Sequence, residues 1–291
     1  MLERENDLRI SATTENEEQF RAVLESGRAD LIYVDAAYTD PADYGKLSGE
    51  AHAAGKLIGL RLPHIWRTEA ESYFAAYLKE VQAAGFDRWL FRNMESVLWF
   101  DQHGLLEGTP YVTDHSMYVT NSEAVREMLS LLPDGGEGLE MMTCPLELNA
   151  AELKELVRDK NFELTVYGRT PMMVSAQCLQ KTTRGCRLQK GKKKDQNVQD
   201  PYGASETTLW LKDRKGALMP VKNSCRLCCN TIYNAVPTVL YDRMDEIRAI
   251  GPTALRYEFT TESSEEIREI LGGRMPSSGG FTRGHFKKSV Q

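Results

Sequence analysis

Short runs of strand-forming residues alternate with longer helical patterns along most of this 291-residue chain. Strands that are separated by helices are expected to pair in parallel, because a parallel pair needs a long crossover connection. A tight hairpin turn would instead join antiparallel strands. Eight such units in one chain of this length predict an α/β fold of the (β/α)8 barrel type. The eight predicted strands begin at Leu8, Asp30, Lys56, Arg88, Pro110, Gly138, Phe162 and Ala254.

Helix start and stop signals follow most of the predicted strands. "TENEEQFRAVLESG" offers a threonine cap at Thr14, an acidic first turn and a stop at Gly27. The run from Thr68 to Gly85 has the same pattern and predicts one longer helix. Asn121 and Asn149 stand in capping position ahead of two further helical patterns.

The repeat is interrupted once, between the seventh and eighth predicted strands. Residues 169–234 carry five of the six cysteines and a hairpin pattern around a turn at Asp213 to Gly216. A segment that follows the carboxyl end of a barrel strand is expected to project from the face where barrel enzymes keep their active sites. We therefore predict one barrel domain over residues 1–291, with this cysteine-rich insertion and a glycine-rich basic tail at 272–291.

Composition narrows the cellular setting. Hydrophobic residues make up 41% of the chain and charged residues 27%, and no apolar run is long enough to span a bilayer, so no membrane partner is expected. The amino-terminal stretch lacks the apolar core of a secretory signal, which predicts a cytoplasmic protein with reduced thiols. The net charge of -6 argues against a surface that binds nucleic acid uniformly.

The cysteines of the insertion predict a metal site. Cys178 and Cys186 precede the hairpin, and Cys225 and Cys228 form a C-x-x-C pair after it, so the four thiols can converge on one ion or cluster. Spacing alone leaves three alternatives: a structural zinc ion, an iron–sulfur cluster, or reduced cysteines that act as small hydrophobes. Cys229 is a spare thiol, either a core residue or an alternative to Cys228.

Polar residues at the predicted carboxyl ends of the strands form a candidate substrate site. Arginine binds carboxylate or phosphate in a bidentate manner and a carboxylate can act as acid or base, so the group suits a small anionic substrate. The alternative is internal ion pairing around the rim. The group consists of the candidate catalytic residues Asp114, Glu147 and Arg169, the candidate substrate-binding residues Arg61, Arg92 and Tyr167, and Asp35 and Glu258.

The sequence contains neither a G-x-S-x-G nor an H-E-x-x-H protease motif. His115 beside Asp114 could form a dyad with Cys144, and a structural histidine is the alternative interpretation. A basic run, Lys181 to Lys194, holds seven lysines or arginines and no acidic residue. It predicts contact with RNA phosphates. The alternative is a solvated loop, which is favoured by the lack of aromatic stacking residues in the run.

The segments "LTVYGRTPMMVSAQC", "LWLKDRKGALMPVKNSCRLCCNTIYNAVP" and "FTRGHF" together resemble the collagenase-like peptidase family, peptidase family U-thirty-two. "YVTDHSMYVTNSEAV" and "CPLELNAAELKEL" are similar to the fifth and sixth barrel units of that family. The resemblance implies a barrel-type fold and a [4Fe-4S] cluster. Its ligands in this chain would be Cys178, Cys186, Cys225 and Cys228.

Some members of that family are called proteases, and others support oxygen-independent hydroxylation of ribosomal RNA, transfer RNA or the ubiquinone ring. The resemblance thus implies an iron–sulfur protein that supports hydroxylation or RNA modification. The alternatives are a peptidase and a non-catalytic barrel with a structural zinc site. After Gly168 this chain continues with Arg169 to Met172, where many members place a cysteine. It is more similar to the C-terminal barrel of the longer, two-barrel members, which implies an additional barrel in a longer parent chain.

Overall fold

Eight parallel strands form a closed barrel in the computed structural model, which describes residues 8–158, 160–186, 208–276 and 280–288. Strand β1 pairs with β2 on one side and with β13 on the other, and β6 pairs with β7, so the ring has no free edge. This closure confirms the predicted (β/α)8 fold. The barrel strands are β1 (Arg9–Thr14), β2 (Leu31–Asp35), β3 (Leu57–Arg61), β4 (Arg88–Phe91), β5 (Tyr111–Thr113), β6 (Leu139–Thr143), β7 (Phe162–Gly168) and β13 (Ala254–Glu258).

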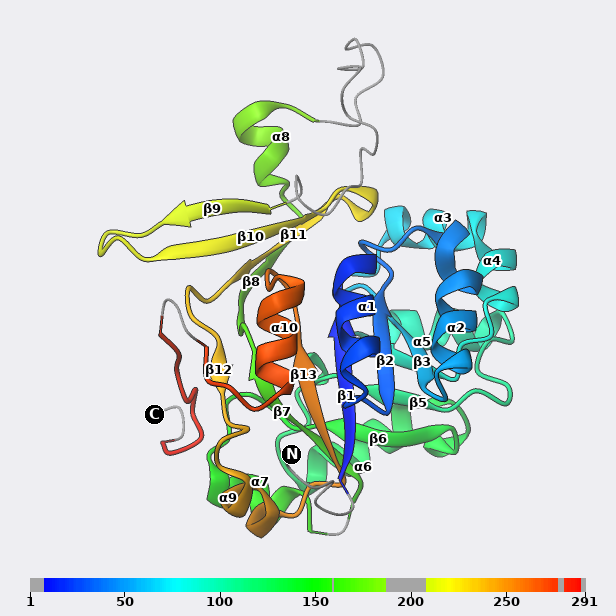
Figure 1. Cartoon of the computed structure of the whole chain (residues 1–291). Coiled ribbons are helices and arrows are strands. Elements are labelled where there is room, and N and C mark those ends of the chain that lie inside the picture. The colour runs from blue at the N-terminus through cyan, green and yellow to red at the C-terminus, as the bar shows by residue number, and fades with distance from the viewer. Residues whose placement is uncertain (1–7, 159, 187–207, 277–279, 289–291) are drawn as a thin grey trace.

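Helices surround the barrel, and their capping residues explain where several of them begin (Figure 1). Asn121 and Asn149 cap their helices as predicted. The first helix is capped by Asn16, whose side chain accepts from the amide of Gln19, and the predicted cap Thr14 belongs to β1 instead. The helices around the barrel are α1 (Glu17–Ser26), α2 (Tyr44–Ala53), α3 (Thr68–Ala76), α4 (Leu78–Ala83), α5 (Met94–Gln102), α6 (Ser122–Leu131), α7 (Ala150–Leu156), α9 (Met244–Ile250) and α10 (Ser264–Leu271).

The predicted long helix from Thr68 to Gly85 is broken in the structure. Tyr77, with φ of -112°, ends α3 and precedes α4, so the two helices change direction there. Tyr73 and Phe74 of α3 pack edge to face, and Phe74 also contacts Trp66 and Trp99 in the layer between helices and barrel. Tight aromatic packing of this kind is a tertiary effect that helix propensity does not contain.

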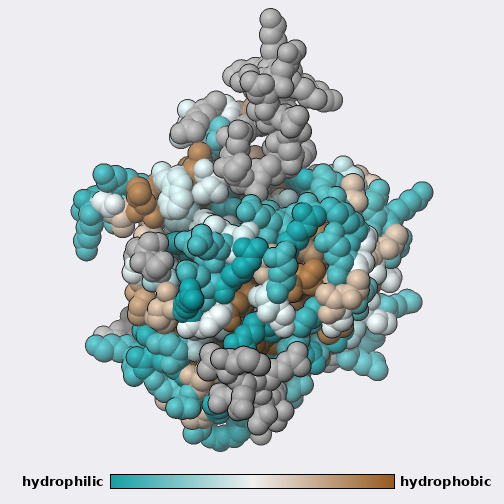
Figure 2. Space-filling view, in the orientation of Figure 1, coloured by the Kyte–Doolittle hydropathy of each residue, from teal (hydrophilic) through white to brown (hydrophobic). Residues whose placement is uncertain are grey.

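A second, antiparallel sheet lies in the chain between β7 and the short strand β12 (Thr238–Val239). Its hairpin turns at Asp213 to Gly216 as predicted and extends away from the barrel (Figure 1). Apolar side chains are exposed on that hairpin (Figure 2), and they belong to Trp210, Leu211 and Leu218. The second sheet consists, in spatial order, of β8 (Pro171–Ser175), β11 (Cys229–Tyr233), β10 (Leu218–Ser224) and β9 (Thr208–Lys212).

The barrel interior has an apolar cluster around Tyr33 and ionic side chains toward the carboxyl ends of the strands, while Arg9 and Arg88 pair with Glu140 at the amino ends. Tyr33 crosses the interior where Gly59 leaves room, since a Cβ at Gly59 would stand 2.5 Å from the tyrosine ring. Leu90, Val112 and Met141 are buried in the same cluster as Tyr33. The main hydrophobic core fills the layer between the outer barrel wall and the helices.

The chain returns over the outside of the barrel after α10. Thr282 pairs with Thr238 of β12, and the carbonyl of Phe286 accepts from the amide of Ala150 at the start of α7. The Phe286 side chain is buried in the main core. Within the described ranges, every helix is too short or too polar to cross a lipid bilayer.

Candidate functional site at the barrel mouth

A buried ionic network fills the carboxyl-terminal end of the barrel. Its members belong to β2, β3, β7 and β13 or come directly after β4 and β5, and all are nearly inaccessible to solvent. Every second residue along a strand points to the same side, which is why Arg256 and Glu258 of β13 both face inward. The network consists of Asp35, Arg61, Arg92, Asp114, His115, Glu163, Arg256 and Glu258.

Two arginines hold the carboxylates of this network together. Arg256 Nη1 lies 2.7 Å from Asp114 Oδ1 and 3.4 Å from Glu258 Oε1, and its Nη2 forms an ion pair with Glu163. Arg61 Nη2 lies 3.5 Å from Glu258 Oε1 and 3.7 Å from Asp114 Oδ2. Burial alone would lower the pKa of both guanidinium groups, but the surrounding carboxylates outweigh it and raise the pKa. Both arginines therefore stay charged.

Asp114 and His115 form a coupled pair within the network. His115 Nδ1 lies 3.0 Å from Asp114 Oδ1. Burial lowers the pKa of His115, but the charge and hydrogen bond of Asp114 outweigh it and raise the pKa overall. Burial raises the pKa of Asp114, but the charges of His115 and Arg256 outweigh it and hold that pKa well below the usual range. The pair therefore favours an imidazolium beside a carboxylate.

Asp114, His115 and Glu258 could also be considered as metal ligands, since one ligand atom of each lies within 4.8 Å of the others. The guanidinium of Arg256, however, already contacts both carboxylates. A divalent cation at this point would face the positive charges of Arg61 and Arg256. The chemistry of the surroundings thus fits an ionic network better than a metal site.

The second sheet closes the centre of the barrel mouth. Lys222 of β10 reaches into it, with Nζ 2.8 Å from Glu15 Oε2, and Ser224 donates to Tyr38 Oη at 3.1 Å. The cavity between sheet and network is about 10 Å³, which leaves room for roughly one water molecule. Arg61 lies beneath this cover with 1% of its side chain exposed.

Two larger openings lie beside the covered centre. One is a groove of about 500 Å³ at the ends of β3, β4 and β5, lined by His64 and Arg92 and by the side chains of three methionines. Burial and the charges of Arg92 and Arg61 hold the pKa of His64 well below its usual value, so the imidazole is neutral. The other opening, which we call the β6–β7 cavity, has a volume of about 330 Å³ and lies at the ends of those two strands.

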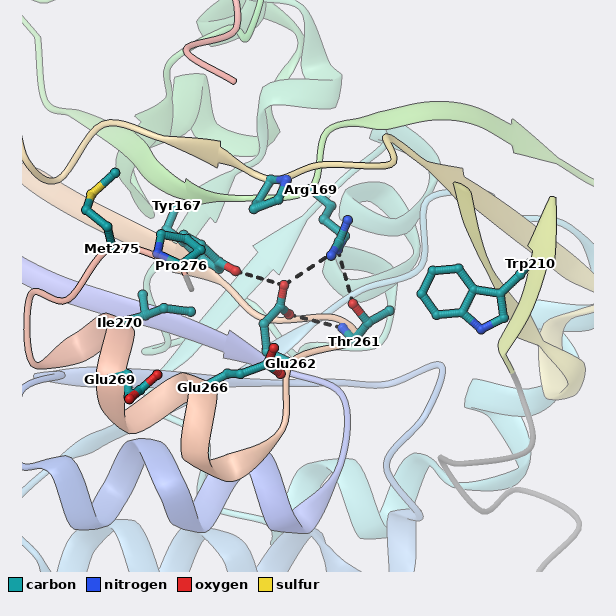
Figure 3. Close-up of a pocket in the computed structure, with 11 residues that line it drawn as sticks. Tyr167, Arg169, Trp210, Thr261, Glu262, Glu266, Glu269, Ile270, Met275 and Pro276 are labelled. Carbon is teal, nitrogen blue, oxygen red and sulfur yellow. Dashed lines mark hydrogen bonds and ion pairs between the residues drawn. The ribbon is translucent and has the colours of Figure 1, made fainter. Parts of the chain in front are cut away.

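Tyr167 and Arg169 lie together in a pocket of about 170 Å³ beside the hairpin (Figure 3). Tyr167 Oη donates to Glu262 Oε1 at 3.0 Å, and Arg169 Nε donates to Thr261 Oγ1 at 3.1 Å. Trp210 of β9 forms the opposite wall. These two predicted residues therefore lie in a pocket apart from Arg61 and Arg92.

The structure places the remaining predicted site residues in separate regions. Asp114 belongs to the buried network, whereas Glu147 is exposed in the wall of the β6–β7 cavity. Cys144 lines the same cavity, where burial raises its pKa well above the usual value. The strand-end residues are thus spread over the network, the groove and two pockets, because the ends of eight strands encircle the mouth.

Cysteines of the insertion lie at the edge of the barrel mouth. Cys178 caps the short helix α8 (Leu179–Arg184), where its Sγ accepts from the amide of Lys181 at 3.3 Å. Cys225 begins a 3-10 turn, and Cys228 ends it in the left-handed conformation with φ of 51°. Burial raises the pKa of Cys228, and so do the charges of Glu69, Cys186 and Cys178. Cys178 and Cys186 therefore each lie within electrostatic range of Cys228.

Cys229 has a different environment from its neighbour. Its side chain is 6% exposed and packs with Ala37, Ala70 and Leu227. Burial raises the pKa of Cys229 to about 11. Cys229 is therefore a core thiol, which was one of the two alternatives for it.

Arg226 anchors the C-x-x-C turn to the barrel. Its guanidinium donates to Tyr73 Oη at 3.2 Å and lies 3.1 Å from Asp40 Oδ2. Tyr73 belongs to α3 and Asp40 to the loop after β2, so the turn that carries Cys225 and Cys228 is fixed to that helix and to that loop. Of the predicted RNA-binding run Lys181 to Lys194, residues 187–194 lie outside the described residues.

Arg256, Glu163, Lys222 and Glu15 belong to the mouth but were not among the predicted site residues. Arg256 lies in the middle of β13 and Glu163 near the amino end of β7, so neither is at the carboxyl end of its strand. The available signal was a charged residue at an inward position of an otherwise apolar strand, because such a residue is rarely buried without a partner. Lys222 gave no comparable signal, since its strand belongs to the second sheet.

Comparison with known proteins adds little beyond the fold. No protein-family model matches this sequence, and no curated protein does. Similar solved structures include an uncharacterized B. cereus protein, with a TM-score of 0.43 and 9% identity over 91% of this chain and 65% of that chain. A mandelate racemase/muconate lactonizing enzyme from Bordetella bronchiseptica RB50 has a TM-score of 0.38 and 9% identity over 56% of this chain and 46% of that chain.

An HpcH/HpaI aldolase from Desulfitobacterium hafniense DCB-2 has a TM-score of 0.34 and 12% identity, over 55% of this chain and 78% of that chain. This chain spans less than two thirds of the B. cereus protein and of the Bordetella enzyme. Similarities at this level bear on the fold alone. The assignment of the barrel rests on the strand order, which is read directly from the pairing.

Proposed function

We propose that Cys178, Cys186, Cys225 and Cys228 hold a [4Fe-4S] cluster and that the protein supports a hydroxylation or an RNA modification. The observation that supports this proposal is that Cys178 and Cys186 lie within electrostatic range of Cys228 at one edge of the barrel mouth. Four thiolates are the usual ligand set of such a cluster. The resemblance of the cysteine segment to the collagenase-like peptidase family supports the same ligands.

The surroundings of the thiols fit a cluster. Cys178, Cys186 and Cys225 are partly buried and Cys228 is exposed, so the sulfurs are accessible for assembly. Cys178 at the start of a helix and Cys228 at the end of a turn each present a side chain that is not part of a sheet face. A bound [4Fe-4S] cluster supplies one-electron transfer. Arg226 and the strands β10 and β11 hold its ligands beside the barrel.

The openings beside the covered mouth would admit a substrate near these thiols. The groove at the ends of β3 to β5 includes Ile65, which packs with the cluster of residues around Cys229. Val174 of β8, four residues before Cys178, lines the same groove. Arg92 and a neutral His64 supply the polar end of the groove. This arrangement would place a small anionic substrate, or an RNA base, next to the cysteine site.

Metal analysis of the purified protein tests the proposal. We expect anaerobically purified protein to show broad absorption near 400 nm and about four iron atoms per chain. Replacing Cys178, Cys186, Cys225 or Cys228 with alanine should abolish both signals. The matched controls are Cys229→Ala and Cys144→Ala, which remove buried thiols and should retain the iron.

The other outcomes have distinct meanings. One equivalent of zinc without iron would overturn the redox function and favour a structural zinc site in a non-catalytic barrel. Collagen or casein cleavage that survives loss of all four ligand cysteines would favour a peptidase instead. Retention of iron in the Cys178→Ala protein together with its loss in the Cys229→Ala protein would show that the ligand set is wrong.

A further inference from the structure

Strand β9 forms a free edge of the second sheet. It stands last in the order β8-β11-β10-β9, and among the described residues it pairs with β10 alone. The hairpin of β9 and β10 extends away from the barrel (Figure 1). A sheet edge of this kind presents a row of backbone groups with which a strand of another chain can pair.

The pairing of the hairpin shows which backbone groups point to the free edge. The Asp213 amide donates to the Ala217 carbonyl at 3.0 Å, so the backbone of Asp213 is directed across the hairpin. In an antiparallel pair such residues alternate with residues whose N–H and C=O groups point to the opposite side. Lys212 and Trp210 therefore direct their N–H and C=O groups toward the free edge. Pro220, which has no N–H group to offer, lies opposite Trp210 and agrees with this alternation.

Apolar side chains flank the free edge on both faces of the sheet. Successive residues of a strand point to opposite faces, so Trp210 and Leu211 lie on different faces, where they are 53% and 38% exposed. Leu218 of β10 is 51% exposed beside them (Figure 2). Proteins commonly protect an edge strand with charge, and Lys212 supplies one such charge. Exposed apolar side chains on both faces of the edge nevertheless favour contact with another chain.

The turn of the hairpin is positively charged. Lys212, Arg214 and Lys215 are exposed, and no ion pair joins any of them to another described residue. Asp213 is the one acidic residue of the turn, and its Oδ1 accepts from the amides of Lys215 and Ala217 at 2.8 Å each. Three cations therefore face one carboxylate that the turn already uses. A partner with acidic residues next to the turn would complement this charge.

The same features favour a protein partner over nucleic acid. A free strand edge offers donors and acceptors in alternation, which match another peptide backbone and not a chain of phosphates. Leu211 and Leu218 add aliphatic surface, which does not stack on bases as an aromatic ring does. Trp210 also forms one wall of the pocket in Figure 3, where Glu266 and Glu269 of the facing helix would repel phosphate.

We propose that the free edge of β9 binds an extended segment of another protein by strand addition, and that this segment is apolar beside Trp210 and Leu211 and acidic beside the turn. The backbone groups of Trp210 and Lys212 pair with the added strand. The carboxylates of the segment lie next to Arg214 and Lys215. This surface does not require the cysteine cluster, so it stands or fails separately from the function proposed above.

Three synthetic peptides test the proposal by fluorescence anisotropy. The first is a short peptide with valines in one half and glutamates in the other. The second has lysines in place of the glutamates, and the third is the glutamate peptide with methyl groups on its central amide nitrogens. We expect the glutamate peptide to bind about tenfold more tightly than either analogue, because one loses the charge complementarity and the other loses the backbone hydrogen bonds.

Two variants at one position separate the edge from the charge. Lys212→Ala removes a charge and keeps the N–H group, so it should weaken binding of the glutamate peptide about two- to threefold. Lys212→Pro also removes the N–H group that points to the free edge, and it should weaken binding about tenfold or more. Because that N–H group takes no part in the pairing with β10, the melting temperature and the iron content should stay close to those of the wild type.

Charge reversal provides a test that does not depend on the proline variant. Arg214→Glu/Lys215→Glu should reverse the preference, so that the lysine peptide binds more tightly than the glutamate peptide. The matched control is Lys79→Glu/Lys154→Glu, at exposed lysines of α4 and α7, which should leave binding unchanged.

Several results would overturn the proposal. They are absence of binding by the glutamate peptide, equal binding of the methylated peptide, and unchanged binding to the Lys212→Pro protein. Oligouridine that displaces the bound peptide would assign the hairpin to nucleic acid instead. Dimerisation of the protein in sedimentation experiments, abolished by Lys212→Pro, would assign the edge to a second copy of this chain.

Discussion

Arg256 is the residue on which the ionic network depends. It contacts Asp114, Glu163 and Glu258 at once, and its side chain is fully buried. The interaction of charges in such a place is strong, but so is the cost of removing each from water. Removal of any one charge would therefore leave its buried partners uncompensated.

Loss of Arg256 should destabilise the fold severely. Arg256→Met keeps much of the side-chain volume but leaves three buried carboxylates without this cation, and we expect it to lower the free energy of unfolding by about 3–5 kcal/mol. Urea unfolding monitored by circular dichroism measures the change. The control is Arg126→Met, whose exposed ion pair with Glu123 should contribute less than about 1 kcal/mol. A loss for Arg256→Met below about 1 kcal/mol would contradict the structural role.

At the level of elements, the second sheet is attached to the barrel through a small number of buried polar contacts. The ion pair between Lys222 and Glu15 joins β10 to the end of β1, and Lys222 Nζ also lies 5.1 Å from the centre of the Tyr38 ring. Arg226 attaches the C-x-x-C turn a few residues further on. The position of the sheet is therefore sensitive to the charge on Glu15.

The stability of the protein should fall as the pH rises through neutrality, and Glu15 should account for part of the decrease. Burial raises the pKa of Glu15 from 4.5 to about 7, although Lys222 acts in the opposite direction. The folded state therefore binds a proton more tightly than the unfolded state, and the resulting stabilisation is full below pH 4.5 and disappears as the pH rises through 7. The decrease should amount to roughly 3 kcal/mol at most.

Urea unfolding at pH 5 and pH 8 measures this effect. Glu15→Gln cannot ionise, so the difference in stability between the two pH values should be smaller in this variant than in the wild type. Glu123→Gln, at an exposed carboxylate, should keep the pH dependence of the wild type. An equal pH dependence in the wild type and the Glu15→Gln protein would show that Glu15 does not titrate in this range.

At the scale of the whole molecule, the sequence predicted the barrel because its signals are repeated and local. Each of the eight strands is a short apolar run, and each was located to within about two residues. The details of single helices were less accessible. Asn16 rather than Thr14 caps the first helix, since β1 continues through Thr14, and α3 ends at Tyr77 because aromatic packing overrides the helical pattern.

The candidate site could be predicted only in part, for a geometric reason. Strand ends identify the residues of a barrel mouth, but not which of them face one another across it. Asp114, Arg61 and Arg92 share the network, while Tyr167, Arg169 and Glu147 lie in other pockets. The sequence also could not reveal that the second sheet covers the centre of the mouth, because that contact joins residues far apart in the chain.

The C-terminal segment should contribute measurably to the stability of the whole barrel. Phe286 is 3% exposed in the main core, so Phe286→Ala should lower the free energy of unfolding by about 3 kcal/mol, the usual cost of deleting a buried aromatic ring. Phe281 is 41% exposed, and Phe281→Ala should change stability by less than about 0.5 kcal/mol. Guanidinium unfolding of both variants checks the difference. Similar losses for both would mean that the segment does not pack as described.

The pairing of β1 with β13 also has a consequence for biosynthesis. A ribosome releases β1 early, yet the partner of its free edge is made only after the second sheet. Until then β1 presents an unpaired parallel edge, which is a recognised site of aggregation. All six cysteines emerge before that edge is covered. The nascent chain therefore carries its complete set of thiols while the barrel is still open, and chaperones and any metal-delivery machinery would meet it in this state.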